Sequence, residues 1–401
     1  MQFIYFRKKK GKTNKEKKIF ISRKGGFYMV NKNRIIEEFM EMTKIDSETR
    51  NEREIADYLR LKLESLGLDV FEDDAGSKIG GNAGNIIAQL PGKNNIKKIL
   101  FSCHMDTVQP GKGIEPILVE GIIKSQGDTI LGADDKAGIS AILEMLRVIK
   151  EEEIEYGPLQ IIFSVAEEGG LHGAKNLDPK HINAQLAYVL DSSGPAGHMV
   201  IQGPAQNQVD AVITGKAAHA GMAPEEGINA IQIAARAIAR MKIGRVDEET
   251  TSNIGVIKGG KATNIVPDKV WLEGEARSLN RDKLDKQSQH MKECLLRAAE
   301  ELGGQVDVKI NLNYPEICLS EDDEVITIAK MAAKNLGFAI VLEKTGGGSD
   351  ANILSGYGIS TLNIGIGMEK VHTTDEFITV ENLVNNARFL VEIVKAARIN
   401  N

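Results

Sequence analysis

The sequence predicts an α/β protein in which helices cover both faces of a mixed sheet, with a smaller α+β domain inserted into the larger one. Three observations lead to this fold class. The chain has 401 residues, more than a single hydrophobic core usually serves, and 42% of them are apolar. Helical and strand patterns alternate in the first and last parts of the chain. Between residues 205 and 313 the order of the elements changes, and after residue 314 the alternation returns.

The large domain begins with two amphipathic helical segments, "NRIIEEFMEM" and "EREIADYLRLKLESLG", and the second one ends at Gly67. Four runs then predict strands at residues 85–90, 99–103, 159–165 and 186–190, with a helix at residues 136–150. These runs are apolar on both faces, which is typical of strands that helices cover on both sides. A last helix is expected at residues 380–398.

The inserted domain is predicted from the order of its elements, which is strand, helix, strand, strand, helix, strand. This order is that of a ferredoxin-like unit. Its first helix should bury one face formed by Ile228, Ile231, Ile238 and Met241. We therefore assign residues 29–204 and 314–401 to the large domain and residues 205–313 to the inserted domain.

The first 28 residues are strongly basic, with ten Lys or Arg and one acid in a chain whose net charge is −6. The rest of the chain is therefore acidic, which argues against a surface that binds nucleic acid. We interpret residues 1–28 as a solvated, disordered tail. The alternative is a wrongly assigned start codon, because Met29 opens the first helical pattern.

The compartment is predicted from the cysteines and from hydropathy. Cys103, Cys294 and Cys318 are odd in number and widely spaced, so they form no disulfide framework and fit a reducing cytosol. No run of 18 apolar residues predicts a membrane span. We expect a cytoplasmic protein that binds neither membranes nor nucleic acid.

Acidic and histidine side chains stand where the predicted elements end or begin. Those that follow strands, or lie in the loops after them, are His104, Asp106, Glu167, Glu168, Asp191 and His372. Asp134 and Asp135 come just before the helix at residues 136–150, where the helix dipole tolerates carboxylates. Ligands of open α/β sheets bind beyond the carboxyl ends of the strands. We therefore expect these side chains to converge on one site.

Converging carboxylates would repel one another unless cations lie between them. Imidazole and carboxylate ligands without a thiolate suit Zn²⁺, and also Mn²⁺ or Co²⁺. Two such ions about 3.5–4 Å apart activate a water and polarise a carbonyl in hydrolytic enzymes. A bridging carboxylate and one free carboxylate acting as base would complete such a site.

Six segments, in order and over the span from residue 29 to the C-terminus, resemble a two-zinc metallopeptidase superfamily. They are "SCHMDTV", "GADDKAG", "VAEEGGLHGAKNL", "LDSSGPAG", "KAAHAGMAPEEGINAI" and "VHTTDEF". The superfamily contains peptidase T, glutamate carboxypeptidase, aminoacylase and succinyl-diaminopimelate desuccinylase, and this chain is most similar to the peptidase T-like branch. The resemblance implies a zinc-peptidase catalytic domain and an inserted domain that serves as a lid and dimerisation surface, so that two copies form a homodimer.

The resemblance also implies roles for single residues. His104 and Asp191 would bind one metal ion, and Glu168 and His372 the other. Asp134 would bridge the two ions and be followed by a cis peptide bond, with Asp135 as a spacer. Asp106 would orient His104. Glu167 would be the general base that activates water.

The inserted domain is expected to supply three more residues. His219, in "KAAHAG", would donate a hydrogen bond to the oxyanion that forms when water attacks. Asn264 and Arg277 match positions that bind the backbone or carboxylate of the substrate in the resembled family. The expected substrates are small peptides, with a di- or tripeptidase or an aminopeptidase as the activity.

Several alternatives stay open at this stage. A carboxypeptidase or a deacylase of N-acyl amino acids would share the metal site and differ in the pocket, and "TGGGSDANILSGYG" departs from the peptidase T pattern there. A binding or regulatory protein that has lost its chemistry is the other class, although no residue of the site is missing. Asp135 and Lys136 are equally well explained as a charge pair at a helix N-terminus.

Overall fold

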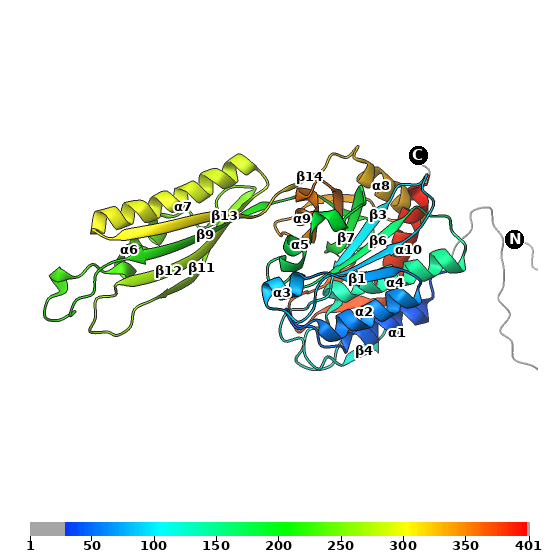
Figure 1. Ribbon diagram of the computed structural model, residues 1–401, viewed down its shortest axis with the longest axis horizontal. Helices are drawn as coiled ribbons and strands as arrows, with labels where there is room; N and C mark the ends of the chain where they lie inside the picture. Colours follow the sequence, from blue (N-terminus) through cyan, green and yellow to red (C-terminus); the bar gives the residue numbers. More distant parts are fainter. Residues whose placement is uncertain (1–28, 399–401) are drawn as a thin grey trace, which may run out of the picture.

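The protein is described by a computed structural model that covers residues 29–398. The predicted tail or alternative start at residues 1–28 lies outside the described residues. Figure 1 shows a large unit and a slender inserted unit, joined where strand β9 begins and strand β13 ends. No helix among the described residues is long and apolar enough to cross a membrane.

The large unit is built on a nine-stranded mixed sheet with the order β1-β2-β6-β3-β7-β16-β8-β14, in which β15 also pairs with β8. Its strands are β1 (Asp69–Glu72), β2 (Ile86–Leu90), β3 (Ile99–His104), β6 (Leu159–Ser164), β7 (Leu186–Ser192), β8 (His198–Gly203), β14 (Ile317–Cys318), β15 (Val341–Lys344) and β16 (Ser360–Gly365). The central strands β6, β3, β7 and β16 are parallel to one another. The four strands predicted from apolar runs are β2, β3, β6 and β7.

Helices cover both faces of this sheet, as predicted. The main core holds α1 (Lys32–Thr43), α2 (Arg53–Ser65), α4 (Ala133–Glu151), α8 (Glu324–Leu336) and α10 (Val380–Ala396). The other face packs against the region of α5 (His172–Asn176) and α9 (Asp350–Gly356), and α3 (Ala75–Ile79) lies beside α5. Successive strand residues point to opposite faces, so Phe101 and Cys103 join the main core and Leu100 joins the other cluster.

A small antiparallel sheet, which sequence analysis did not predict, lies beside the large one. Its order is β17-β18-β5-β4. The strands are β4 (Pro116–Val119), β5 (Ile122–Ser125), β17 (Met368–Glu369) and β18 (Phe377–Thr379). The loop between β17 and β18 carries His372, so this sheet determines where that side chain lies.

The inserted unit has the predicted order of elements. They are β9 (Ala205–Thr214), α6 (Ala230–Arg240), the short β10 (Gly244–Arg245), β11 (Thr250–Gly259), β12 (Lys269–Ser278), α7 (Arg281–Leu302) and β13 (Gln305–Tyr314). The antiparallel sheet has the order β10-β11-β12-β9-β13, and both helices pack on one face of it. The predicted fold class is therefore confirmed.

The predicted buried face of α6 is confirmed in part, because Ile228, Ile238 and Met241 pack against the core of the inserted unit and Ile231 does not. Ile231 is 42% exposed, whereas Ala230, Ile233, Ala234 and Ala237 are fully buried. The helix packs against α7 and the sheet through a stripe of small residues with the spacing i, i+3, i+4, i+7. Three of these four residues are alanines, whose small apolar surface was outweighed by the isoleucines in the sequence pattern.

Candidate metal centre

The predicted acidic and histidine residues of the large unit lie together at the carboxyl ends of its parallel strands. His104 is the last residue of β3, Glu167 and Glu168 follow β6, and Asp191 lies near the end of β7. Asp134 belongs to the first turn of α4, and His372 comes from the loop between β17 and β18. A cavity of about 240 Å³ is lined by Asp134, Glu167, Glu168, Asp191 and His372, together with residues from neighbouring strands, loops and helix α9.

Three groups of side chains bring potential metal-binding atoms within 4.8 Å of one another. They are His104, Asp134 and Asp191; Asp134, Glu168 and His372; and His104, Glu167 and Glu168. The first two groups correspond to the two predicted ligand sets, with Asp134 as the shared member. The third group contains the predicted base, Glu167, so geometry alone leaves open whether Glu167 is a ligand.

Asp134 contacts both histidines. Its Oδ1 lies 3.0 Å from Nε2 of His104, and its Oδ2 lies 3.3 Å from Nε2 of His372. The same Nε2 of His372 is 2.8 Å from Oε1 of Glu168. Both imidazoles therefore turn a nitrogen towards carboxylates that lie between them.

The electrostatics of this cluster show that it is suited to cations. Hydrogen bonds to Asp134 and Glu168 raise the pKa of His372 to about 10. Burial would raise the pKa of Asp134, but hydrogen bonds with His104 and His372 outweigh it and lower this pKa. Burial raises the pKa values of Glu167 and Asp191 well above the usual range. Protons thus balance the charge of the cluster, and divalent cations on the same nitrogen and oxygen atoms would displace them.

Asp106 was predicted to orient His104 through its carboxylate, and the structure shows a different distribution of contacts. Nδ1 of His104 lies 2.9 Å from the backbone oxygen of Asp106 and 3.5 Å from its Oδ1. The carboxylate accepts hydrogen bonds from the backbone N–H groups of Glu167 (2.9 Å) and Glu168 (3.2 Å). It also accepts one from the hydroxyl of Thr49 at 2.8 Å. Asp106 therefore contacts the turn that carries two other residues of the site.

Glu52 is a buried carboxylate that sequence analysis missed. Its Oε1 accepts hydrogen bonds from the backbone N–H groups of Arg50 (2.7 Å) and Ala166 (3.1 Å). With Asp106, it binds three consecutive N–H groups of the turn at residues 166–168. Burial raises the pKa of Glu52 to about 7. In the sequence this residue resembles any acid before a helix, so only its burial distinguishes it.

Asp135 and Lys136 are fully buried, so they are not a solvated charge pair at the start of α4. Nζ of Lys136 donates a hydrogen bond to the backbone oxygen of Ile45 at 2.8 Å, and burial lowers the pKa of Lys136 to about 7. The peptide bond between Asp134 and Asp135 is cis, as the resemblance implied.

The structure does not bring His219 and Asn264 to the cavity. Both are exposed, and they lie side by side through a bridge between His219 and Ile265 beyond the end of β9. Strand β9 has ten residues and leads away from the large unit, so its far end is roughly 30 Å from the junction. Figure 1 shows the turn after β9 at the end of the inserted unit that is remote from the large unit.

Arg277 lies much closer to the junction. It pairs in register with Gln206, the second residue of β9. Its guanidinium donates two hydrogen bonds to Glu275, at 2.9 and 3.1 Å. A substrate carboxylate would therefore have to compete with Glu275 for this side chain.

Comparisons with known proteins agree with this geometry. The pattern of peptidase family M20/M25/M40 matches residues 100–396. YqjE, an uncharacterized protein of Bacillus subtilis (strain 168), is 47% identical over 92% of this chain and 100% of its own. The crystal structure of aminopeptidase PepT from Bacillus cereus ATCC 10987 is 48% identical, covers 92% of this chain and 99% of that chain, and has a TM-score of 0.84. A tripeptidase from Staphylococcus aureus subsp. aureus Mu50 is 43% identical, with 92% and 100% covered and a TM-score of 0.87.

Proposed function

Because the chain belongs to peptidase family M20/M25/M40, and is therefore a metallopeptidase, we propose that it hydrolyses an amide bond of small peptides. The proposed activity is that of a di- or tripeptidase or an aminopeptidase, with Glu167 as the general base. The observation that carries it is the convergence of two histidines and several carboxylates from distant segments on one cavity. Two of the similar solved structures are of an aminopeptidase and a tripeptidase.

The proposed ligands follow the donor groups described above. His104 and Asp191 would hold one ion, Glu168 and His372 the other, and Asp134 would belong to both sets. Zn²⁺ is the proposed ion, with Mn²⁺ and Co²⁺ as substitutes that the same nitrogen and oxygen ligands accept. When bound, two such ions polarise the scissile carbonyl and make a water more acidic.

Glu167 is the proposed base because it lines the cavity and stands outside the two proposed ligand sets. Its carboxylate would take the proton of the attacking water and deliver it to the nitrogen that leaves. Its backbone N–H is bound by Asp106, so the side chain starts from a fixed point. Glu167→Gln tests the assignment. The protein should lose metal on this change if Glu167 is a ligand, and it should keep its metal if Glu167 is the base.

The cavity offers no cationic side chain that could hold a substrate by a free carboxylate. The residues that line it include four carboxylates and no Lys or Arg. A substrate carboxylate would therefore find no cationic side chain there, and Arg277 of the inserted unit is bound to Glu275. A carboxypeptidase or a deacylase of N-acyl amino acids is thus the second candidate.

The proposed role of His219 needs a change from the arrangement described here, because this residue lies far from the cavity of its own chain. Either the inserted unit closes, or a second copy presents its His219, which would make the protein a homodimer through that unit. Mixing His219→Ala with Glu167→Gln separates the two cases. Shared sites would restore about a quarter of the wild-type activity in randomly mixed dimers, whereas closure within one chain restores none.

The proposed function is tested by a panel of dipeptides, tripeptides and N-acetyl amino acids, each assayed with Zn²⁺, Mn²⁺ and Co²⁺. We expect hydrolysis of unblocked peptides, its loss with a chelator, and its return with added metal. Metal analysis should give about two ions per chain. Cleavage of the N-acetyl compounds alone would support the second candidate, and a protein that binds no divalent ion would overturn the proposal.

A further inference from the structure

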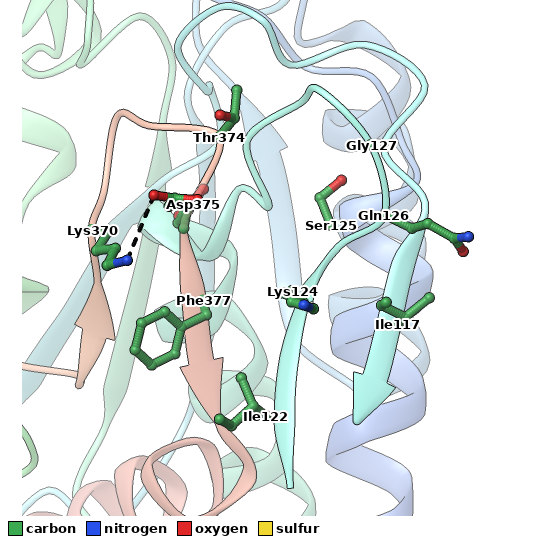
Figure 2. A pocket seen from close by; sticks show the side chains of 11 residues that line it. Ile117, Ile122, Lys124, Ser125, Gln126, Gly127, Lys370, Thr374, Asp375 and Phe377 are labelled. Carbon is green, nitrogen blue, oxygen red and sulfur yellow. Dashed lines mark ion pairs between the residues drawn. The ribbon is translucent and has the colours of Figure 1, made fainter. Parts of the chain in front are cut away.

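The loop that carries His372 is held by few regular elements. It connects β17, which has two residues, to β18, which has three. His372 has a left-handed backbone, with φ of 62°, and its side chain is 51% exposed. Figure 2 shows the loop beside a cavity of about 560 Å³, where Lys370 and Asp375 form an ion pair at 3.6 Å. Both of these side chains are more than half exposed, so their pairing holds the loop only weakly.

Glu376, the last residue before β18, differs from its neighbours because it is 1% exposed. Its Oε2 accepts hydrogen bonds from the backbone N–H groups of Leu131 and Gly132, each at 2.8 Å. Its Oε1 accepts a third from the backbone N–H of Asp134 at 3.0 Å. One buried carboxylate thus binds three N–H groups of the segment that leads into α4.

We propose that Glu376 is a positioning residue that fixes Asp134 and His372 relative to each other. The proposal rests on the proposed function, since it takes these two residues as ligands. Glu376 follows His372 by four residues in the same loop, and its carboxylate binds the backbone of Asp134 itself. Within residues 29–398, Glu376 is the side chain that accepts hydrogen bonds from the N–H groups of Leu131, Gly132 and Asp134.

The segment at Asp134 needs such support. Asp134 and Asp135 have non-helical backbone angles although they lie in the first turn of α4, so helical hydrogen bonds do not define their geometry. Hydrogen bonds from N–H groups to a carboxylate are stronger than those between neutral groups. Three of them on one buried side chain therefore place the segment at residues 131–134 against the His372 loop.

Two roles of Glu376 can be told apart by experiment, namely stabilising the fold only and positioning the proposed ligands. If Glu376 only stabilised the fold, its loss would lower the melting temperature and leave the affinity for metal unchanged. If it positions Asp134 and His372, its loss weakens metal binding, because partners that orient ligands typically contribute roughly 10–100-fold to metal affinity. Added metal then restores turnover, since Glu376 itself does not touch the substrate.

Glu376→Gln is the test variant, because the amide keeps the shape of the side chain but turns a donor towards at least one N–H group. Asp375→Asn is the matched control, an exposed acid one residue away in the same loop. Competition with a chelator should show Zn²⁺ binding roughly 10–100-fold weaker in Glu376→Gln and unchanged in Asp375→Asn. Turnover of Glu376→Gln should approach the wild-type value at saturating Zn²⁺.

Amide hydrogen exchange of the metal-free wild-type protein is a second measurement, which does not depend on the folding of any variant. The amides of Leu131, Gly132 and Asp134 should be protected. Rapid exchange of these amides in the wild type would overturn the inference, and so would wild-type affinity for both ions in Glu376→Gln. If the wild-type protein itself bound no divalent ion, the proposed function would fail instead.

Discussion

The replacement of Asp106 by Asn should disturb the metal centre through Glu168, a proposed ligand whose backbone N–H is bound by the carboxylate of Asp106. Oδ1 of Asp106 accepts the N–H of Glu167, and Oδ2 accepts the N–H of Glu168 and the hydroxyl of Thr49. The amide of Asn must place its NH₂ at one of these two positions. The hydroxyl of Thr49 can accept as well as donate, so the NH₂ should take the place of Oδ2 and leave the N–H of Glu168 without an acceptor.

The size of the effect follows from that single lost interaction. A hydrogen bond to a charged group contributes about 1.5–3 kcal/mol, which corresponds to roughly 10–150-fold in an equilibrium constant. The backbone contact of His104 with the oxygen of Asp106 is unchanged by the substitution. We therefore expect Zn²⁺ to bind Asp106→Asn more weakly by a factor in this range, mainly through loss of order at Glu168.

The assay is titration of the metal-free protein with Zn²⁺ against a chromophoric chelator, with urea unfolding measured in parallel. Thr49→Val is the matched control, because it removes a hydrogen bond from the same carboxylate but leaves both glutamate N–H groups bound. It should lower the free energy of unfolding by about 1.5–3 kcal/mol with near wild-type metal affinity. Wild-type affinity in Asp106→Asn, or an equal loss in Thr49→Val, would refute the reasoning.

Three further changes have distinct expected outcomes. Glu167→Gln should lower turnover by roughly 10²–10⁴-fold at wild-type metal content, and loss of metal instead would make Glu167 a ligand. Gly138→Ala should lower the free energy of unfolding, measured with urea, by about 1–3 kcal/mol, because a Cβ at Gly138 would lie 2.4 Å from Oδ1 of Asp135. Gly346→Ala is the control, because a Cβ at Gly346 would have no atom of another residue within 4 Å. Burial raises the pKa of Glu52 from 4.5 to about 7. Between these two pH values the folded chain keeps a proton that the unfolded chain releases. The stabilisation that is present below pH 4.5 is therefore lost as the pH rises through 7. Glu52→Gln should therefore unfold like the wild type below pH 4.5 and be more stable by roughly 3 kcal/mol above pH 7, and a difference that does not vary with pH would contradict this.

The parts of the fold that the sequence could predict are those in which local pattern and final burial coincide. Strands β2, β3, β6 and β7 are buried on both faces along most of their length, so most of their residues are apolar and the pattern is plain. The small sheet was missed because its strands have only two to four residues. Even in β5, exposed and buried residues alternate over a run of only four, which is too short to stand out in the sequence. The buried face of α6 was predicted only in part, because close packing selects alanine, which carries little weight in a hydrophobic pattern.

The candidate site divides in the same way. The convergence of His104, Asp134, Glu168, Asp191 and His372 could be predicted because residues of the types that bind metal ions stand at the ends of strands and in the loops after them. Glu52 and Glu376 could not, because any acid before a helix or in a loop looks the same until the fold buries it. The position of His219 depends on the arrangement of two units in space, about which the order of residues along the chain says nothing.

The carboxylates that bind backbone N–H groups around the site suggest why it contains more negative charge than metal binding requires. Asp106 and Glu376 accept hydrogen bonds from backbone N–H groups of the two segments that carry Glu167, Glu168 and Asp134. Neutral acceptors could make the same hydrogen bonds with less repulsion, so charge must serve another purpose. Stronger hydrogen bonds hold irregular backbone more firmly, and ligands on irregular backbone need that restraint most. If the proposed ions bind here, they would relieve the added repulsion that destabilises the metal-free site, so the same carboxylates that fix the proposed ligands would also increase the difference in stability between the two states.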